Sequence, residues 1–222
     1  PTHEHEAVKK LEKCIVDIRA WMASNFLKLN DDKTELLILG SHSNVSKLNT
    51  TSIKVGEATI QSSSNVRNIG AIFDQQLKMD YQISSTCKSA WFRIHQISKI
   101  RQYLTNDQTK SIVHAYVTSK IDQNNSLLIG VPDKLINKIQ KVQNAAAKII
   151  YRAKKHDHVT GLLKELHWLP VPQRITFKTL LLTYKALHNE DPIYLRELLK
   201  WHEPSRNLRS ANELMLQVPK TR

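Results

Sequence analysis

The sequence contains few glycines and few cysteines, and each shortage excludes a class of protein. Only 5 of the 222 residues are glycine, at positions 40, 56, 70, 130 and 161. Neither the dinucleotide-binding pattern G-x-G-x-x-G nor the P-loop pattern G-x-x-x-x-G-K-[ST] can therefore be written. The 2 cysteines can form at most one bridge, which excludes a disulfide scaffold and makes a reducing compartment the default.

Long hydrophobic runs are also missing. Residues 36–39 and 180–182 are among the longest, far short of the roughly 20 residues that cross a bilayer. Residues 1–6 are polar, lack an initiator Met and do not resemble a signal peptide. We expect an intracellular chain that was part of a longer protein.

Positive charge is abundant, and it is unevenly distributed. The formal net charge is +13. Residues 1–74 carry 9 Lys and Arg against 9 Asp and Glu, whereas residues 75–222 carry 24 against 11. A neutral part is thus joined to a basic part. Lysine-rich solubility and polyanion binding both fit this excess.

The spacing of apolar residues predicts an α+β fold. Residues 6–24 have the three-to-four spacing of an amphipathic helix, and residues 33–39 read as a strand. Residues 52–55 and 58–60 suit a tight hairpin around Gly56. Residues 66–73 read as a further strand, in which Gly70 marks a bulge or a close approach to the backbone.

Beyond residue 75 the periodicity is helical. Turn formers and prolines divide this part into six segments. We expect helices at about 80–100, 106–119, 133–152, 158–165, 172–188 and 192–201.

Catalytic and metal-binding patterns are weak. Asp31 and Asp32 could be taken for a pair that holds two Mg²⁺ ions, but they lie in a polar stretch and not in a tight turn between apolar strands. The 10 histidines do not group with the 2 distant cysteines as zinc ligands do. Cys14 falls on the apolar face of a helix, where a thiol is usually inert. We expect no metal site in this chain.

The basic residues from position 134 onward follow a helical spacing. They step by 4, 3, 7, 4 and 3 residues, which keeps them in one arc of a helix at about 100° per residue. The row consists of Lys134, Lys138, Lys141, Lys148, Arg152 and Lys155. No acidic residue lies between Asp133 and Asp157 to pair with it. At about 1.5 Å per residue the row predicts a line of cations about 30 Å long, suited to the phosphates of a duplex.

Further cations lie on neighbouring helical segments. They are Lys88, Arg93, Lys99, Arg101, Arg174 and Lys178. Two explanations fit these cations: they contact a nucleic-acid backbone, or they form a lysine-rich surface that is only solvated. We expect Trp168, close to Pro170 and Pro172, to pack against the protein and not to stack on a base.

Five stretches in order resemble the reverse transcriptases of LINE-type, non-LTR retrotransposons, most closely the jockey-like and chicken-repeat branch. They cover nearly the whole chain. The stretches are residues 21–35 (WMASNFLKLNDDKTE), 65–74 (NVRNIGAIFD), 124–132 (NNSLLIGVP) with 142–147 (VQNAAA), 166–178 (LHWLPVPQRITFK) and 208–210 (LRS).

The resemblance implies the C-terminal part of a polymerase. Residues 1–75 would be the end of the palm, 76–155 a helical thumb-like domain and 156–222 a helical post-thumb extension. Lys33 would be the candidate general acid for the leaving pyrophosphate in nucleotidyl transfer. The hairpin that the resemblance implies around residues 66–73 would be the primer grip, with Asn68, Ile69 and Gly70 placed against the primer end. The partners implied are an RNA template, a DNA primer and the fingers and remaining palm of the same polymerase, located in the nucleus and cytoplasm.

The sequence also departs from the family. The Ala-Asp-Asp turn that binds Mg²⁺ in the full-length polymerase is not present, so we expect no cofactor in this chain and no polymerisation by it alone. Residues 121–125 (IDQNN) differ from the more usual LDYCN, as a decayed copy of the element would. A non-catalytic helical protein-interaction module is the alternative function.

Overall fold

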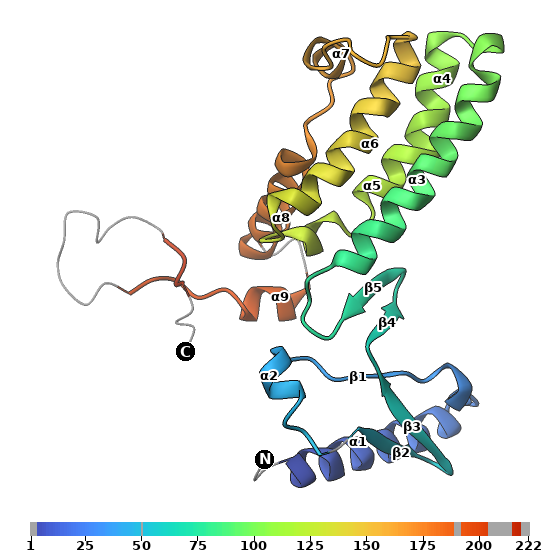
Figure 1. The fold of residues 1–222 in the computed structure, drawn as a ribbon. Coiled ribbons are helices and arrows are strands. Elements are labelled where there is room, and N and C mark those ends of the chain that lie inside the picture. Colours follow the sequence, from blue (N-terminus) through green and yellow to red (C-terminus); the bar gives the residue numbers. More distant parts are fainter. Residues whose placement is uncertain (1–3, 50, 189–191, 204–214, 219–222) are drawn as a thin grey trace.

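The computed structural model describes residues 4–49, 51–188, 192–203 and 215–218, and its fold is α+β (Figure 1). A small α/β part, residues 4–74, lies at one end, and a helical bundle that begins with α3 (Asp80–Ile100) lies at the other. The fold class predicted from the apolar spacing is confirmed. The predicted boundary near residue 75 coincides with the passage from the last strand to α3.

The α/β part consists of one long helix and a three-stranded sheet. Helix α1 (Glu4–Ser24) packs on β2 (Ser52–Val55). Strand β3 (Ala58–Ser63) pairs antiparallel with β2 and parallel with β1 (Leu36–Leu37), which gives the order β1-β3-β2. The hairpin predicted around Gly56 is confirmed, and the positive φ of +64° at Gly56 explains why glycine is placed there.

The strand predicted over residues 33–39 is mostly wrong. Only two of its residues, those of β1, pair with another strand. The residues before them form a 3-10 helix, η1 (Asp31–Lys33), because the side chain of Asn30 accepts a hydrogen bond from the amide of Lys33 and caps the turn. A short helix that the polar composition concealed, α2 (His42–Val45), follows, capped in the same way by Ser41.

A second, two-stranded sheet leads into the bundle. Strands β4 (Asn65–Asn68) and β5 (Ala71–Asp74) form a tight hairpin, so the single strand predicted from the apolar spacing over residues 66–73 is wrong, whereas a hairpin, which the resemblance implied there, is present. Ile69 and Gly70 make the turn with positive φ angles of 46° and 81°, as two-residue hairpin turns require. Gly70 is therefore a turn residue and not a bulge.

The bundle contains six of the described helices beyond the hairpin. Their bounds agree with the predicted helices within two or three residues for most ends. Besides α3 they are α4 (Asn106–Val113), α5 (Ser119–Asp122), α6 (Asp133–Tyr151), α7 (Thr160–Glu165) and α8 (Val171–Leu187). A π-helix, η3 (His114–Thr118), joins α4 to α5, so the predicted helix 106–119 changes its winding instead of ending. Helix α9 (Ile193–Glu197) is shorter than the 192–201 predicted.

One core runs through the bundle. Its largest fully buried members include Ile83 on α3, Val117 on η3, and Ile139 and Ile150 on α6. Side chains of α7 and α8 belong to the same core. It therefore crosses residue 155, and residues 76–155 and the helices that directly follow pack as one unit rather than as two domains. Phe73 of β5 also packs against it.

Candidate nucleic-acid interface

Three lysines of α6 form a row on the outward side of that helix. At about 100° per residue, Lys134, Lys138 and Lys141 lie opposite the buried side that carries Ile139, and all three are exposed. Among the described residues none of them is ion-paired with a carboxylate. The amphipathic pattern of α6 therefore presents a line of free ammonium groups to solvent.

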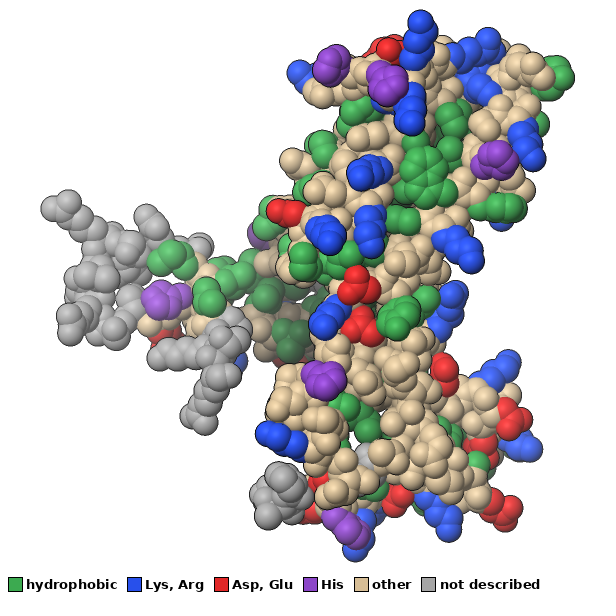
Figure 2. Space-filling model, in the orientation of Figure 1, with side chains coloured by type: hydrophobic (Ala, Val, Ile, Leu, Met, Phe, Trp, Pro, Cys, Tyr) green, Lys and Arg blue, Asp and Glu red, His purple; other side chains and the backbone are tan. Residues whose placement is uncertain are grey.

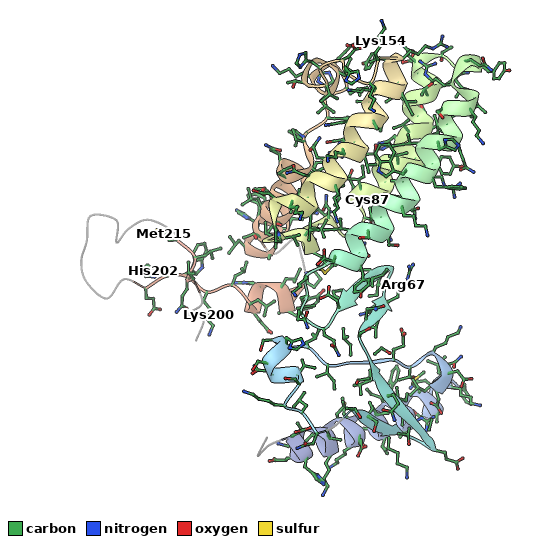
Figure 3. The ribbon with its side chains drawn as sticks, viewed as in Figure 1. Arg67, Cys87, Lys154, Lys200, His202 and Met215 are labelled. Atoms are coloured by element: carbon green, nitrogen blue, oxygen red, sulfur yellow. The ribbon has the colours of Figure 1, made fainter. Side chains whose placement is uncertain are left out.

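Helix α3 continues this basic surface beside α6. Lys88 and Lys99 are exposed on its outward side. Burial raises the pKa of the Cys87 thiol, one residue before Lys88, and the positive charge of Lys138 on α6 lowers it by less. Figure 2 shows Lys and Arg side chains over α3 and α6 on the same face, and Figure 3 labels Cys87 between these helices. We call Lys88, Lys99, Lys134, Lys138 and Lys141 the α3–α6 basic face.

The second half of the predicted row lies at and beyond the end of α6: Lys148 is in its last turn, and Arg152 and Lys155 follow it. Arg152 has a left-handed backbone, with a φ of 53°, and ends α6. Lys155 lies beyond that end, so it does not continue the row. The ammonium group of Lys148 donates a 2.5 Å hydrogen bond to the carbonyl of Lys155, and Nη2 of Arg152 lies 3.3 Å from the carbonyl of Arg101. These contacts hold the chain where α6 ends.

Arg101 was predicted to contact nucleic acid, and this prediction is wrong. Its side chain is only 7% exposed. The guanidinium donates to the carbonyls of Leu104, Ile149 and Ile150 and to Oδ1 of Asn106, at 2.5 to 2.8 Å. Burial, and then the charge of Arg152, lower its pKa from a value so high that the group stays charged at neutral pH. Arg101 closes the ends of α3 and α6 and is not available to phosphate.

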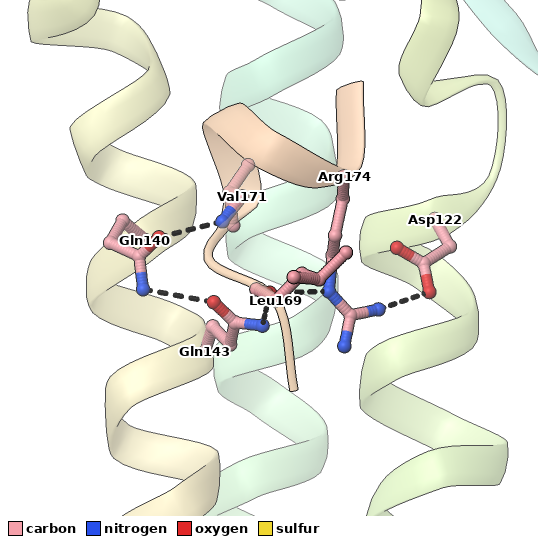
Figure 4. Close-up of polar contacts among 6 residues, drawn as sticks. All are labelled: Asp122, Gln140, Gln143, Leu169, Val171 and Arg174. Atoms are coloured by element: carbon pink, nitrogen blue, oxygen red, sulfur yellow. Dashed lines mark hydrogen bonds and ion pairs between the residues drawn. The ribbon is translucent and has the colours of Figure 1, made fainter. Parts of the chain in front are cut away.

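Arg174 was also predicted to contact nucleic acid, but the structure pairs it with a carboxylate of the protein itself. It lies near the start of α8, where Nη1 donates to Oδ2 of Asp122 at 2.6 Å and Nε donates to the carbonyl of Leu169 at 2.8 Å (Figure 4). The guanidinium also lies 5.9 Å from the ring centroid of Trp168. Trp168 itself packs against the bundle core, as predicted. The charge of Arg174 is thus neutralised by a carboxylate, whereas Lys178, one turn further along α8, is exposed.

Two glutamines of α6 fix the segment that precedes Arg174. Oε1 of Gln140 accepts from the amide of Val171 at 2.8 Å, and Nε2 of Gln143 donates to the carbonyl of Leu169 at 2.9 Å (Figure 4). Nε2 of Gln140 in turn donates to Oε1 of Gln143. Gln143 is 2% exposed. This hydrogen-bonded amide pair, of which Gln143 is buried, therefore anchors the turn into α8.

Arg93 lies on another side of α3, next to exposed aromatic rings. Its guanidinium carbon is 5.6 Å from the ring centroids of both Phe92 and Tyr116, within cation–π range. Tyr116 is carried by the π-helix η3. Both rings are more than half exposed, and exposed aromatic rings beside a cation suit base stacking. The sequence signal for this group was the sequence of two aromatic residues and an arginine at positions 91–93 on a helix, which the spacing of the cations alone does not show.

The predicted primer-grip residues lie in the β4–β5 turn and touch the bundle. Asn68 ends β4, and Ile69 and Gly70 form the turn. The carbonyl of Ile69 accepts a 3.4 Å hydrogen bond from Nδ2 of Asn124. A Cβ added to Gly70 would lie 2.9 Å from Nε2 of Gln123. The expected close approach at Gly70 is thus an approach by the protein's own side chain.

Lys33, the candidate general acid, lies in η1 and is exposed. Its neighbour Asp31 is ion-paired with Arg19 at 2.5 Å, so the charge of that carboxylate is used within the protein. Among the described residues no three His, Cys, Asp or Glu side chains converge as metal ligands do. No described helix is long and apolar enough to span a bilayer.

Comparison with protein-family models, with curated proteins and with solved structures gives no significant match. The function of this surface therefore follows from its own geometry. Of the predicted basic residues, Lys134, Lys138 and Lys141 lie along one side of α6, and Lys88 and Lys99 are exposed on the adjacent helix α3. Arg101 and Arg174 are used inside the protein, and Lys148, Arg152 and Lys155 stabilise the end of α6.

Proposed function

We propose that this chain is the template–primer-binding portion of an RNA-directed DNA polymerase of the LINE type, and that the α3–α6 basic face lies along the sugar-phosphate backbone of the duplex. The observation that carries the proposal is the row of Lys134, Lys138 and Lys141 on the outward side of a rigid helix, which has no ion pair with any carboxylate in the part of the chain that the structure describes. Polymerisation itself would need the Mg²⁺-binding aspartates of the complete enzyme.

The dimensions of the row suit a nucleic-acid backbone. The three lysines span seven residues, or about 10 Å along α6. A duplex carries one negative charge per about 1.7 Å of its axis, so each ammonium group can reach a phosphate without any change in the helix. Lys88 and Lys99, exposed on the adjacent helix α3, add further positive charge.

The contact between the hairpin and the bundle supports the proposed primer grip. Because the carbonyl of Ile69 is bonded to Asn124, the turn is fixed relative to the helices that would hold the duplex. A turn held in this way can position a primer strand by geometry alone. In this proposal Lys33 remains the candidate proton donor, since its side chain is exposed and has no ion pair among the described residues.

Helix α1 offers a surface for the rest of the polymerase. None of its residues is buried, and apolar side chains such as Val16 and Trp21 are more than 60% exposed. Exposed apolar surface of this kind is usually covered by a partner. We assign it to the fingers and remaining palm, and we expect concentration-dependent self-association of the isolated chain in sedimentation experiments. A strictly monomeric chain at all concentrations would contradict this assignment.

Titration of a short RNA–DNA hybrid at several salt concentrations tests the proposal. If all five lysines touch phosphates, the log–log plot of the binding constant against salt should have a slope of about −4 to −5, because each neutralised phosphate contributes about −0.9. A flat dependence, or no binding at low salt, would leave the helical protein-interaction module as the better explanation.

A further inference from the structure

Two exposed aromatic rings and one arginine form a group where α3 packs against η3. Phe92 and Arg93 belong to α3, and Tyr116 belongs to the π-helix. Phe92 is 58% exposed and Tyr116 is 53% exposed, although the guanidinium of Arg93 lies over both rings. Much of the ring surface is therefore still open to solvent. We call these three residues the Arg93 aromatic cluster.

The guanidinium of Arg93 is held in place by the protein. Its Nη1 donates a 2.9 Å hydrogen bond to Oε1 of Gln96, one turn further along α3. The same group contacts a ring on each of two elements, so it links α3 to η3. A planar cation that is already oriented loses little freedom when a flat ring stacks on the group. The cluster is thus prepared for a flat ligand.

Tyr116 is carried by an irregular turn of the chain. The π-helical winding of η3 is rare in proteins and occurs mostly as single turns, frequently at functional sites. The two residues that follow, Val117 and Thr118, are both buried. They anchor the turn in the bundle and leave the ring of Tyr116 at the surface beside Arg93.

The charges around the cluster suit a polyanion. Residues 81–106 and 108–121, which carry the cluster, contain no Asp or Glu. Three exposed lysines lie on the same segments: Lys88, Lys99 and Lys120. At about 100° per residue, the two lysines of α3 fall within about 40° of Phe92 around the helix. The third follows Tyr116 by about one turn. An uncharged protein surface would leave these ammonium groups unpaired, whereas a nucleic-acid strand offers both flat rings and regularly spaced phosphates.

We propose that the Arg93 aromatic cluster stacks the bases of an unpaired nucleic-acid strand while the lysines around it contact the phosphates. This inference deepens the proposed function, on which it rests. Phe92 lies between Lys88 and Lys99 along α3, so the cluster adjoins the α3–α6 basic face, and a strand that continues beyond the duplex can reach the rings. Stacking on aromatic side chains accepts every base, because every base has a π-face. The cluster therefore holds the strand without reading its sequence.

A matched pair of single-stranded RNAs tests the inference. One strand has all its bases, and the other has the same length and charge but carries abasic residues. Each is titrated into the full chain and followed by fluorescence anisotropy. We expect the intact strand to bind at least about tenfold more tightly, because only its bases can stack. Equal affinity for the two strands would overturn the inference and show that charge alone holds them.

Ring variants assign the difference to the cluster. Phe92→Leu combined with Tyr116→Leu keeps apolar side chains but removes both rings. This double variant should bind the intact strand about tenfold more weakly and the abasic strand unchanged. Tyr116→Phe keeps the ring and should behave as the unmodified chain does. Tyr103→Leu, at a ring outside the cluster that is 79% exposed, is the matched control and should change neither affinity.

An equal loss for both strands in the double variant would also overturn the inference, because stacking cannot act on an abasic strand. Thermal melting establishes that the double variant is folded. If it is not, the ratio of the two affinities in the unmodified chain still decides.

The RNA–DNA hybrid separates failure of this inference from failure of the proposed function. If the hybrid binds with the expected salt slope but the ring variants bind the intact strand normally, only the stacking site is wrong. If neither the hybrid nor either single strand binds the unmodified chain, both proposals are wrong.

Discussion

The backbone amide of Met79 donates a 2.7 Å hydrogen bond to Oδ2 of Asp74, a buried carboxylate at the point where β5 passes into α3. Oδ1 of the same residue accepts from the amides of Gln76 and Lys78. One side chain thus satisfies three amides in the turn before α3, whose N-cap residue Met79 offers no side-chain cap of its own.

Replacing Asp74 should therefore destabilise the connection between the hairpin and the bundle. We expect Asp74→Ala to lower the free energy of unfolding by about 2–3 kcal/mol, because several amides lose their acceptor in a buried place. Urea denaturation measures the change. Asp80→Ala, at an exposed acid in the first turn of α3, is the control and should cost less than about 1 kcal/mol. Equal losses in both variants would contradict the role of Asp74.

Arg101 should contribute to stability and not to nucleic-acid binding. Arg101→Lys keeps the positive charge but cannot reach all four oxygens, and we expect a loss of about 2–3 kcal/mol in the free energy of unfolding. The salt dependence of hybrid binding should not change for the folded fraction. If Arg101→Lys leaves the free energy of unfolding unchanged but weakens hybrid binding, Arg101 belongs to the nucleic-acid interface after all.

The lysine row of α6 can be tested as a unit. Changing Lys134, Lys138 and Lys141 to Gln should reduce the magnitude of the salt slope of hybrid binding by about 2–3. The control changes Lys9, Lys13 and Lys47, three exposed lysines of the α/β part, and so removes the same total charge. If both triple variants reduce the slope equally, the net charge of the chain and not the row would explain binding.

Stability should fall at alkaline pH. Burial raises the pKa of the Cys87 thiol above its ordinary value. Burial, together with the hydrogen bond to Glu165, also raises the pKa of Tyr151. The folded chain then keeps protons that the unfolded chain has lost, so the free energy of unfolding decreases as the pH rises above about 8.5, the ordinary value for Cys.

Urea denaturation between about pH 7.5 and about pH 10.5 measures this decrease. Tyr151→Phe should make the decrease shallower, since it removes one of the two titrating groups. Tyr103→Phe, at a ring that is 79% exposed, is the matched control and should leave the profile as it is. A constant free energy across this range would show that neither group changes its pKa on folding.

Local signals explain why most helices and the hairpin around Gly56 could be predicted, and why the strand over residues 33–39 could not. Thr105 forms a capping box with Gln108, and Pro170 and Pro172 flank the first residue of α8, so the sequence itself marks these helix starts. The residues around β1 carry no such mark. Their pairing with β3 depends on residues more than twenty positions away, and η1 is decided by a single asparagine side chain.

The candidate site could be predicted only where it depends on one helix. The periodicity of α6 placed Lys134, Lys138 and Lys141 correctly on an outward side. The environments of Arg101 and Arg174 depend on partners about fifty residues away, Ile149 and Asp122, which no local pattern reveals.

The four acceptors of Arg101 are all uncharged oxygens, three from the backbone and one from Asn106. Acid cannot protonate such oxygens in the range in which it neutralises carboxylates. The joint between the ends of α3 and α6 is therefore insensitive to acidification. The opposite end of the bundle depends instead on carboxylate acceptors, those of Asp74 and Asp122.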